Sequence, residues 1–153
     1  MTSDSSADCV VDASVGIKLF LVESLSDETH ALFRRLTDDP PARFYIPDLF
    51  YVECTNILWK YVRRLGLPQA DAALFAVQLG QLALVPSPTA ALIDDALKIA
   101  LMHAITAYDA AYVALAGQLD LPLITADARL ARALAESDHD VRWLGDLPEP
   151  VAE

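Results

Sequence analysis

Two apolar segments that have the character of buried strands both lead into an aspartate. Residues 9–12 end on Asp12, and residues 122–126 are followed directly by Asp127. Carboxylate oxygens are hard ligands of the kind that Mg²⁺ binds in proteins, so aspartates at two strand ends can form a cation site. An aspartate after a strand can also serve simply as the N-cap of the next helix. Both interpretations are open from these two residues alone.

A third carboxylate lies in a helical pattern over residues 48–65. With about 100° between successive residues, Glu53 lies on one side of this helix with an amide and three cations, Asn56, Lys60, Arg63 and Arg64. The opposite side is apolar and consists of Tyr51, Cys54, Ile57, Leu58, Tyr61, Val62 and Leu65. An acid followed by cations fits a metal ligand beside a phosphate-binding strip. An ordinary solvated helix face has the same pattern.

A fourth carboxylate, Asp109, opens an alanine-rich helical segment over residues 107–119, with Tyr108 and Tyr112 close by. An acid in the first turn of a helix gains from the helix dipole, so a structural role is again open. The chain has three histidines and two well-separated cysteines, which give no credible zinc spacing. Oxygen ligands are therefore the candidate metal donors.

The elements that must position these acids alternate between strands and helices. The expected strands are residues 9–12, 44–47, 82–85, 122–126 and 141–144. The expected helices are residues 15–23, 26–39 with Ser26 as N-cap, 48–65 ending at Gly66, 68–79, 89–104, 107–119 and 127–137. Apolar strands separated by helices indicate a parallel sheet covered on both faces. Ligands bind such sheets at the carboxyl ends of the strands, so Asp12 and Asp127 are expected at one edge.

The composition is that of one globular domain. The chain has 153 residues, of which 54% are hydrophobic, and a net charge of −11. This charge argues against general affinity for nucleic acid, although a local basic strip or bound metal ions can offset it. The sequence has no apolar run long enough for a transmembrane helix and no signal peptide, and Cys9 and Cys54 are expected as reduced thiols. We therefore expect a cytoplasmic protein without membrane contact, with a domain at residues 8–146 between tails at 1–7 and 147–153.

Four segments together resemble the PIN-domain ribonucleases, in particular the VapC-type toxins of toxin–antitoxin pairs. They are "VVDASVGIK", "PDLFYVECTNIL", "TAYDAAYVALA" and "LITADARL", in the order and spacing of that family. The resemblance covers about residues 8–145. It implies an α/β fold, a three-layer α/β/α PIN-like fold with a central, mostly parallel five-stranded sheet.

The resemblance also implies roles for particular residues. Asp12, Glu53, Asp109 and Asp127 match the acidic quartet that holds Mg²⁺ or Mn²⁺, and whether one or two ions act is open. The residues expected to orient these carboxylates are Ser14, Thr125 and Asn56. The candidate contacts to RNA phosphates are Lys18, Arg129 and Lys60, with Arg63 and Arg64 further away.

The function implied is that of a metal-dependent endoribonuclease that leaves a 5′-phosphate and a 3′-hydroxyl. Its expected partners are an RNA substrate, a VapB-like antitoxin that places an apolar helix in a groove and a basic side chain near the acids, and a second copy in a homodimer. Residues 73–85 are a candidate apolar surface for that dimer. Alternatives are a housekeeping PIN nuclease, a non-catalytic partner-binding module, and a phosphatase with an aspartate nucleophile. The phosphatase lacks its second aspartate, because Ser14 stands there, and its late strand-end lysine.

Overall fold

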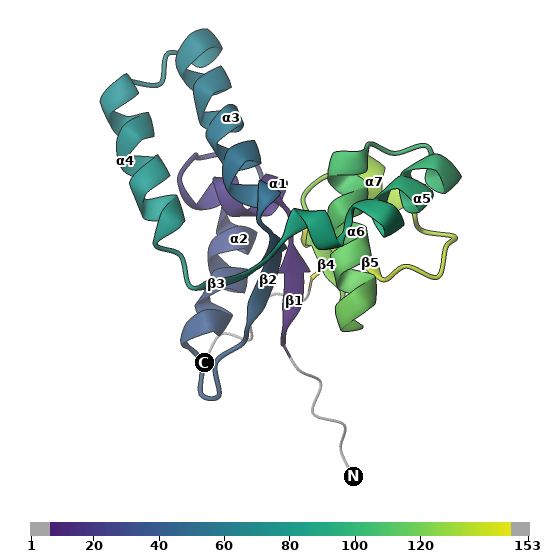
Figure 1. The fold of residues 1–153 in the computed structure, drawn as a ribbon. Helices are drawn as coiled ribbons and strands as arrows, with labels where there is room; N and C mark the ends of the chain where they lie inside the picture. The colour runs from purple at the N-terminus through teal and green to yellow at the C-terminus, as the bar shows by residue number, and fades with distance from the viewer. Residues whose placement is uncertain (1–6, 148–153) are drawn as a thin grey trace.

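The structure, a computed structural model, describes residues 7–147 and has one parallel sheet at its centre (Figure 1). The strand order is β3-β2-β1-β4-β5, and each neighbouring pair is parallel. The strands are β1 (Cys9–Val11), β2 (Phe44–Pro47), β3 (Leu84–Ser87), β4 (Leu123–Thr125) and β5 (Val141–Trp143). The expected α/β fold with a five-stranded sheet is confirmed. The expected tails fall almost entirely on residues 1–6 and 148–153, which lie outside the described residues.

Helices cover the sheet on both sides. They are α1 (Ala13–Gly16), α2 (Ser26–Phe33), α3 (Leu49–Leu65), α4 (Gln69–Gly80), α5 (Ile93–His103), α6 (Ala107–Leu119) and α7 (Ala128–Ala133). Short 3-10 turns are η1 (Ile17–Leu19), η2 (Arg34–Thr37), η3 (Thr89–Ala91) and η4 (Leu144–Asp146). Figure 1 shows α2, α3 and α4 on one side and α5, α6 and α7 on the other. Right-handed crossovers require this arrangement, because the chain reverses direction across the sheet after β3.

The topology brings several helix starts to one edge of the sheet. Helices α1, α3 and α7 each follow closely after a strand, so their first residues lie at the carboxyl edge. Helix α6 packs on β1, β2 and β4 and ends just before β4 begins, so its first turn lies at that same edge. The four acids expected from the sequence are all in these segments.

Helix α6 is the buried helix of the fold. Its fully buried residues are Ala110, Ala111, Tyr112, Val113, Ala114, Leu115 and Ala116. Small side chains at most of these positions let the helix lie close to the sheet on one side and to α5 on the other. A helix that is apolar all round is a core helix, and α6 therefore fixes the position of Asp109 rigidly.

Some expected boundaries are wrong by a few residues. Strand β3 begins two residues later than expected and includes Pro86, which an edge strand tolerates because its outer N–H needs no partner. The expected helix 15–23 ends as α1 and η1 by Leu19. Ser26 is not the N-cap of α2: Leu25 takes that position with a φ of 67°, and Ser26 Oγ accepts the Glu23 N–H instead. Gly66 does end α3, with a φ of 74°.

A close contact between Gly16 and Phe50 sets the distance between α1 and α3. A Cβ atom at Gly16 would lie 2.5 Å from Cζ of the fully buried Phe50 ring. Overpacking of this kind costs about 1–3 kcal/mol, so we expect Gly16→Ala to lower the free energy of unfolding by that amount in urea titrations. Gly117 in α6 has open space around it and is the matched control, because Gly117→Ala is expected to be neutral or stabilising. Equal stability of both variants would contradict the contact.

In residues 7–147 no single helix is both long and apolar enough to cross a membrane. Helices α5 and α6 reach the required length and composition only as a pair, and the chain bends by 115° between them.

Candidate active site

Asp12 lies at the centre of the carboxyl edge of the sheet and is almost completely buried. It follows β1 directly and is 4% exposed. The Ser14 hydroxyl donates a hydrogen bond to Asp12 Oδ1. Asp12 occupies the N-cap position of α1, where its carboxylate interacts with the Val15 N–H without a well-formed capping bond. The carboxylate is therefore oriented mainly by Ser14 and Thr125, and the helix that follows contributes less.

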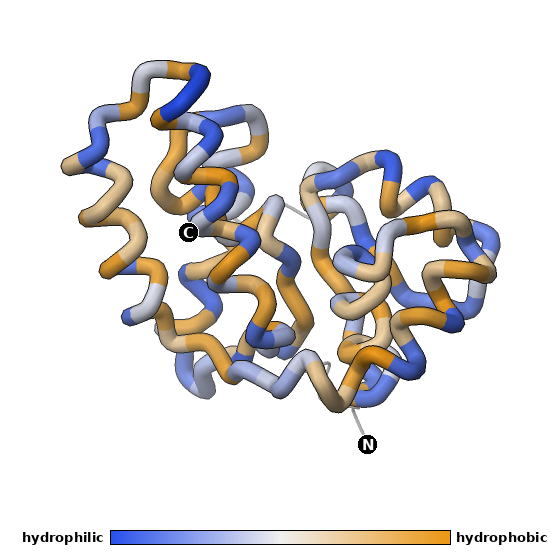
Figure 2. Tube along the Cα trace, turned by 45° about the horizontal axis from the view of Figure 1, so that its top comes forward, coloured by the Kyte–Doolittle hydropathy of each residue, from blue (hydrophilic) through white to orange (hydrophobic). Residues whose placement is uncertain are grey.

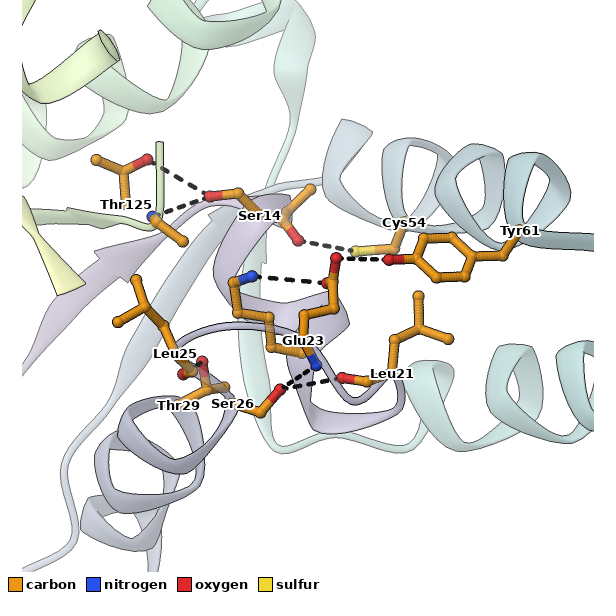
Figure 3. A network of polar contacts seen from close by, with 12 residues as sticks. Ser14, Leu21, Glu23, Leu25, Ser26, Thr29, Cys54, Tyr61 and Thr125 are labelled. Carbon is orange, nitrogen blue, oxygen red and sulfur yellow. Dashed lines mark hydrogen bonds and ion pairs between the residues drawn. The ribbon is translucent and has the colours of Figure 1, made fainter. Parts of the chain in front are cut away.

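Ser14 and Thr125 connect the ends of β1 and β4 through their side chains (Figure 3). Ser14 Oγ lies 3.5 Å from Thr125 Oγ1 and accepts the Ala126 N–H at 3.0 Å. Thr125 Oγ1 in turn accepts the Asp127 N–H at 3.0 Å. Because the Thr125 hydroxyl also interacts with Asp12, these contacts hold the Asp12 carboxylate in one orientation.

Asp127 serves as the N-cap of α7. Its Oδ1 accepts the backbone N–H groups of Arg129 at 2.9 Å and Leu130 at 3.4 Å. The interpretation of Asp127 as a helix N-cap is thus confirmed. Because only Oδ1 takes part in the capping, the second carboxylate oxygen is still available to the other acids at this edge. Arg129 is exposed beside it on the first turn of α7.

Asp109 lies in the first turn of α6, which is capped by Thr106. The Thr106 Oγ1 accepts the Asp109 N–H at 3.1 Å, and the Thr106 hydroxyl also interacts with the Asp109 carboxylate. The cap relieves Asp109 of that role and leaves its half-buried carboxylate available at the edge of the sheet.

Glu53 reaches the same edge from the second turn of α3. Its side chain is half-buried, and its Oε1 atom is buried without a hydrogen-bond partner. The Tyr112 hydroxyl from α6 faces this carboxylate and is also buried without a partner. The two groups interact, but their oxygens lie outside good hydrogen-bond geometry. In the sequence, Tyr112 follows Asp109 by three residues and so lies on the same face of the helix. This spacing is the sequence signal that Tyr112 also faces the acidic edge, where Glu53 lies.

Burial and neighbouring carboxylates raise the pKa of three of these acids. Burial raises the pKa of Asp12 to about 6, and the charge of Asp109 adds to this rise. Hydrogen bonds from the Ser14 and Thr125 hydroxyls act in the opposite direction and lower the pKa. Burial also raises the pKa of Glu53 to about 6, with further contributions from Asp12 and Asp109. Burial and the charge of Asp127 raise the pKa of Asp109. These electrostatic effects link Glu53 to Asp12 and Asp109, and Asp109 to Asp127, so the edge carries concentrated negative charge.

The donor set fits a hard divalent cation, although the side chains do not form a closed ligand shell. In residues 7–147 no group of three or more His, Cys, Asp or Glu side chains is arranged so that it could hold a metal ion. The neighbouring groups are all carboxylates, and Glu53 contributes a buried oxygen without a partner. Oxygen donors of this kind match Mg²⁺ or Mn²⁺, which keep several waters and need few protein ligands.

The basic residues expected to contact RNA lie in different environments. Lys18 is buried, and its Nζ pairs with Glu23 Oε1 at 3.6 Å, while the Tyr61 hydroxyl donates to Glu23 Oε2 at 2.5 Å (Figure 3). Sequence reasoning did not identify this Glu23 network, because Tyr61 lies 38 residues from Glu23 in the chain. Lys60 is exposed on α3.

The rest of the α3 stripe is also exposed. Asn56 points to solvent one turn after Glu53, and Arg63 and Arg64 are exposed near the end of the helix. The Arg63 guanidinium lies 5.9 Å from the centre of the exposed Trp59 ring. On the apolar side Cys54 and Leu58 are buried as expected, but Leu65 is exposed.

A three-layer α/β fold with acids from four segments at one sheet edge defines a class of protein with a carboxylate-rich site. The PIN domain family matches residues 9–135, and the chain belongs to that family. Over 124 residues the chain is 35% identical to ribonuclease VapC3 of Pyrobaculum aerophilum, which covers 80% of this chain and 91% of that protein. A stretch of 33 residues is 64% identical to ribonuclease VapC1 of Mycobacterium tuberculosis, covering 22% of this chain and 25% of that protein.

Solved structures have the same fold. The crystal structure of PAE2754 from Pyrobaculum aerophilum has a TM-score of 0.63 and 25% identity, over 90% of this chain and 91% of that one. The crystal structure of FitAcB from Neisseria gonorrhoeae has a TM-score of 0.61 and 20% identity, over 91% of this chain and 99% of that one.

Proposed function

We propose that the chain is a divalent-metal-dependent endoribonuclease and the toxin of a toxin–antitoxin pair. The observation that carries this proposal is the set of four carboxylates at one sheet edge, each of which interacts electrostatically with at least one of the others. The ribonuclease name of a relative that is 35% identical over most of the chain supports RNA as the substrate.

The chemistry follows from the side chains at this edge. When bound, Mg²⁺ or Mn²⁺ lowers the pKa of a water molecule and stabilises charge on the phosphate. Asp12, Glu53, Asp109 and Asp127 would hold the metal. Ser14 and Thr125 orient Asp12 through the contacts described above, which reduces the reorganisation that cation binding requires.

Cleavage of RNA by the purified chain tests this function. The chain is incubated with structured and single-stranded RNAs in Mg²⁺ or Mn²⁺, and with EDTA as the control. We expect endonucleolytic products with 5′-phosphate and 3′-hydroxyl ends only when metal is present. Cleavage that persists in EDTA, or no cleavage across these RNAs and metals, would contradict the proposal.

The exposed side of α3 and the start of α7 are the proposed path for RNA. Lys60 and Arg129 are exposed there, and the Trp59–Arg63 pair offers a ring and a guanidinium on which bases can stack. Lys18 is a proposed contact that depends on release of its pairing with Glu23. With a net charge of −11, binding outside this path should be weak and sensitive to salt.

The proposed antitoxin is a basic partner in the cytoplasm, where the two buried cysteines stay reduced. A cationic side chain from its docked segment would neutralise the acids, which complements the negative charge of this chain. Expression of the chain alone is expected to arrest growth, and co-expression with the reading frame beside it is expected to restore growth. A housekeeping nuclease would show no such rescue.

We also propose a homodimer, formed through the exposed face of α5. Ile93, Leu97 and Leu101 are four residues apart and form an apolar row whose exposed fraction reaches 77% at Leu101. Hydrophobic positions recur along this helix and along α4 (Figure 2). A row of this kind is self-complementary, so a second copy related by a two-fold axis can cover it.

A substitution in each apolar surface distinguishes the two candidate dimer contacts. Leu101→Glu is expected to give a monomer in size-exclusion chromatography with light scattering, because it places a charge in the proposed contact. Val77→Glu alters the exposed α4 surface within residues 73–85 and is expected to leave the dimer intact. The reverse result would assign the dimer to α4, and a wild-type monomer would remove it.

A further inference from the structure

The Glu53 carboxylate lacks the orienting hydrogen bonds that Asp12 and Asp127 have. Asp12 accepts the Ser14 hydroxyl, and Asp127 accepts two backbone N–H groups. The Tyr112 hydroxyl is the group that faces Glu53. The geometry of this pair therefore decides how well Glu53 is oriented.

The pair consists of two buried polar atoms that each lack a partner. Tyr112 is 1% exposed, and its hydroxyl and Glu53 Oε1 are among the three buried side-chain N or O atoms of the described residues without a hydrogen bond. Such atoms are uncommon in folded proteins because leaving one unpaired costs about 1–3 kcal/mol. Because these two unpaired atoms face each other, a small rotation of the Glu53 side chain would bring them into a hydrogen bond.

We propose that Tyr112 is a positioning residue for metal binding: when a cation binds, the Tyr112 hydroxyl donates to Glu53 Oε1, and Oε2 is the oxygen left to bind the cation. This inference rests on the divalent-metal site proposed above. Burial raises the pKa of Tyr112, so the phenol stays a neutral donor. Tyr112 lies on the buried helix α6, and Glu53 lies on the peripheral helix α3. The hydroxyl of Tyr112 therefore has a fixed position from which it can orient the Glu53 carboxylate.

Tyr112→Phe removes the hydroxyl and keeps the ring. We expect the Kd for Mn²⁺, measured by titration calorimetry, to rise about tenfold, as for other residues that orient metal ligands. We also expect the melting temperature in EDTA to stay unchanged or rise, because the hydroxyl has no partner to lose. A merely structural role would give the opposite pair of results, with a lower melting temperature and an unchanged Kd.

Tyr61→Phe is the matched control, because it removes a hydroxyl that does have a partner, Glu23. It is expected to lower the melting temperature in EDTA and leave the Kd for Mn²⁺ unchanged. In a Glu53→Gln background, Tyr112→Phe is expected to add no further loss of affinity, because the group that it positions is altered.

Each outcome has a distinct meaning. Wild-type protein that binds no Mn²⁺ would overturn the metal site, and with it the role of Tyr112. Wild-type binding with equal affinity in Tyr112→Phe would overturn the positioning role alone. Full additivity of the two substitutions, or a Tyr112→Phe protein that does not fold, would also overturn it.

Discussion

Asp109→Asn is expected to reduce metal-dependent RNA cleavage by roughly a hundredfold or more while the fold is retained. Stabilisation of transition-state charge by a metal is worth several kcal/mol, and each 1.36 kcal/mol corresponds to a tenfold change in rate. The asparagine keeps the size of the side chain and the backbone bond to Thr106, so α6 should begin as before. Rates are measured on one defined RNA at saturating Mg²⁺, with circular dichroism as the check on folding.

The same substitution should raise the melting temperature of the metal-free protein. The charge of Asp109 raises the pKa of Asp12 and of Glu53, which means that at neutral pH it destabilises both ionised carboxylates. Removal of that charge relieves the repulsion. For a chain of this size, an increase of about 1 kcal/mol in the free energy of unfolding corresponds to a rise of about 2–4 °C in the melting temperature.

Asp71→Asn is the control for both effects. Asp71 also lies in the first turn of a helix, α4, but is exposed and away from the acidic edge. Its substitution should leave cleavage unchanged and lower the melting temperature slightly, because it removes a favourable interaction with the helix dipole. An Asp109→Asn enzyme that cleaves RNA at the wild-type rate would remove the proposed site.

The sequence predicted the sheet and the edge at which the acids lie, because apolar strands and intervening helices are local patterns. It could not assign the strand-end aspartates to their roles. Asp12 and Asp127 both stand at the N-cap position of the helix that follows, yet only Asp127 accepts well-formed hydrogen bonds from that helix. The difference depends on whether Ser14 and Thr125 meet beside the carboxylate, which is a tertiary contact between β1 and β4.

Helical periodicity also has a limit at the edges of the core. It placed Glu53 on the polar stripe of α3 with Lys60, but Glu53 is half-buried because α6 lies beside its end of the helix, whereas Lys60 is exposed. Lys18 was expected as a phosphate contact and is buried against Glu23. A charge pattern within one helix gives no information about the residues that other elements place next to it. Those neighbouring residues decide which charged side chains are buried and which form ion pairs.

The melting temperature of the metal-free protein is expected to fall as the pH rises from 5 to 7, and Mg²⁺ or Mn²⁺ should reverse this fall. The pKa values of Asp12 and Glu53 are raised to about 6, so from about pH 4 until the pH has passed through that value the folded state binds more protons than the unfolded state. Stability therefore decreases with rising pH across that window. For Asp12 alone, a rise from 3.8 to about 6 corresponds to about 3 kcal/mol.

Metal binding needs the ionised carboxylates, so its contribution has the opposite dependence on pH. At a free concentration of 100 times the Kd, binding to the folded state adds about 2.7 kcal/mol, or about 5–10 °C in this size range. The difference in melting temperature between metal and EDTA should therefore be small at pH 5 and largest above pH 6.5. Differential scanning calorimetry at fixed ionic strength measures both curves.

Asp12→Asn separates these carboxylates from the other acids of the chain. Without the buried Asp12 charge, the metal-free curve should fall less steeply between pH 5 and 7, and the metal-dependent gain should be lost. A metal-free melting temperature that rises over this range in the wild-type protein would show that the strand-end carboxylate is not destabilised by burial. Equal curves with and without millimolar metal would show that the acidic edge holds no cation, whatever its resemblance to the PIN family.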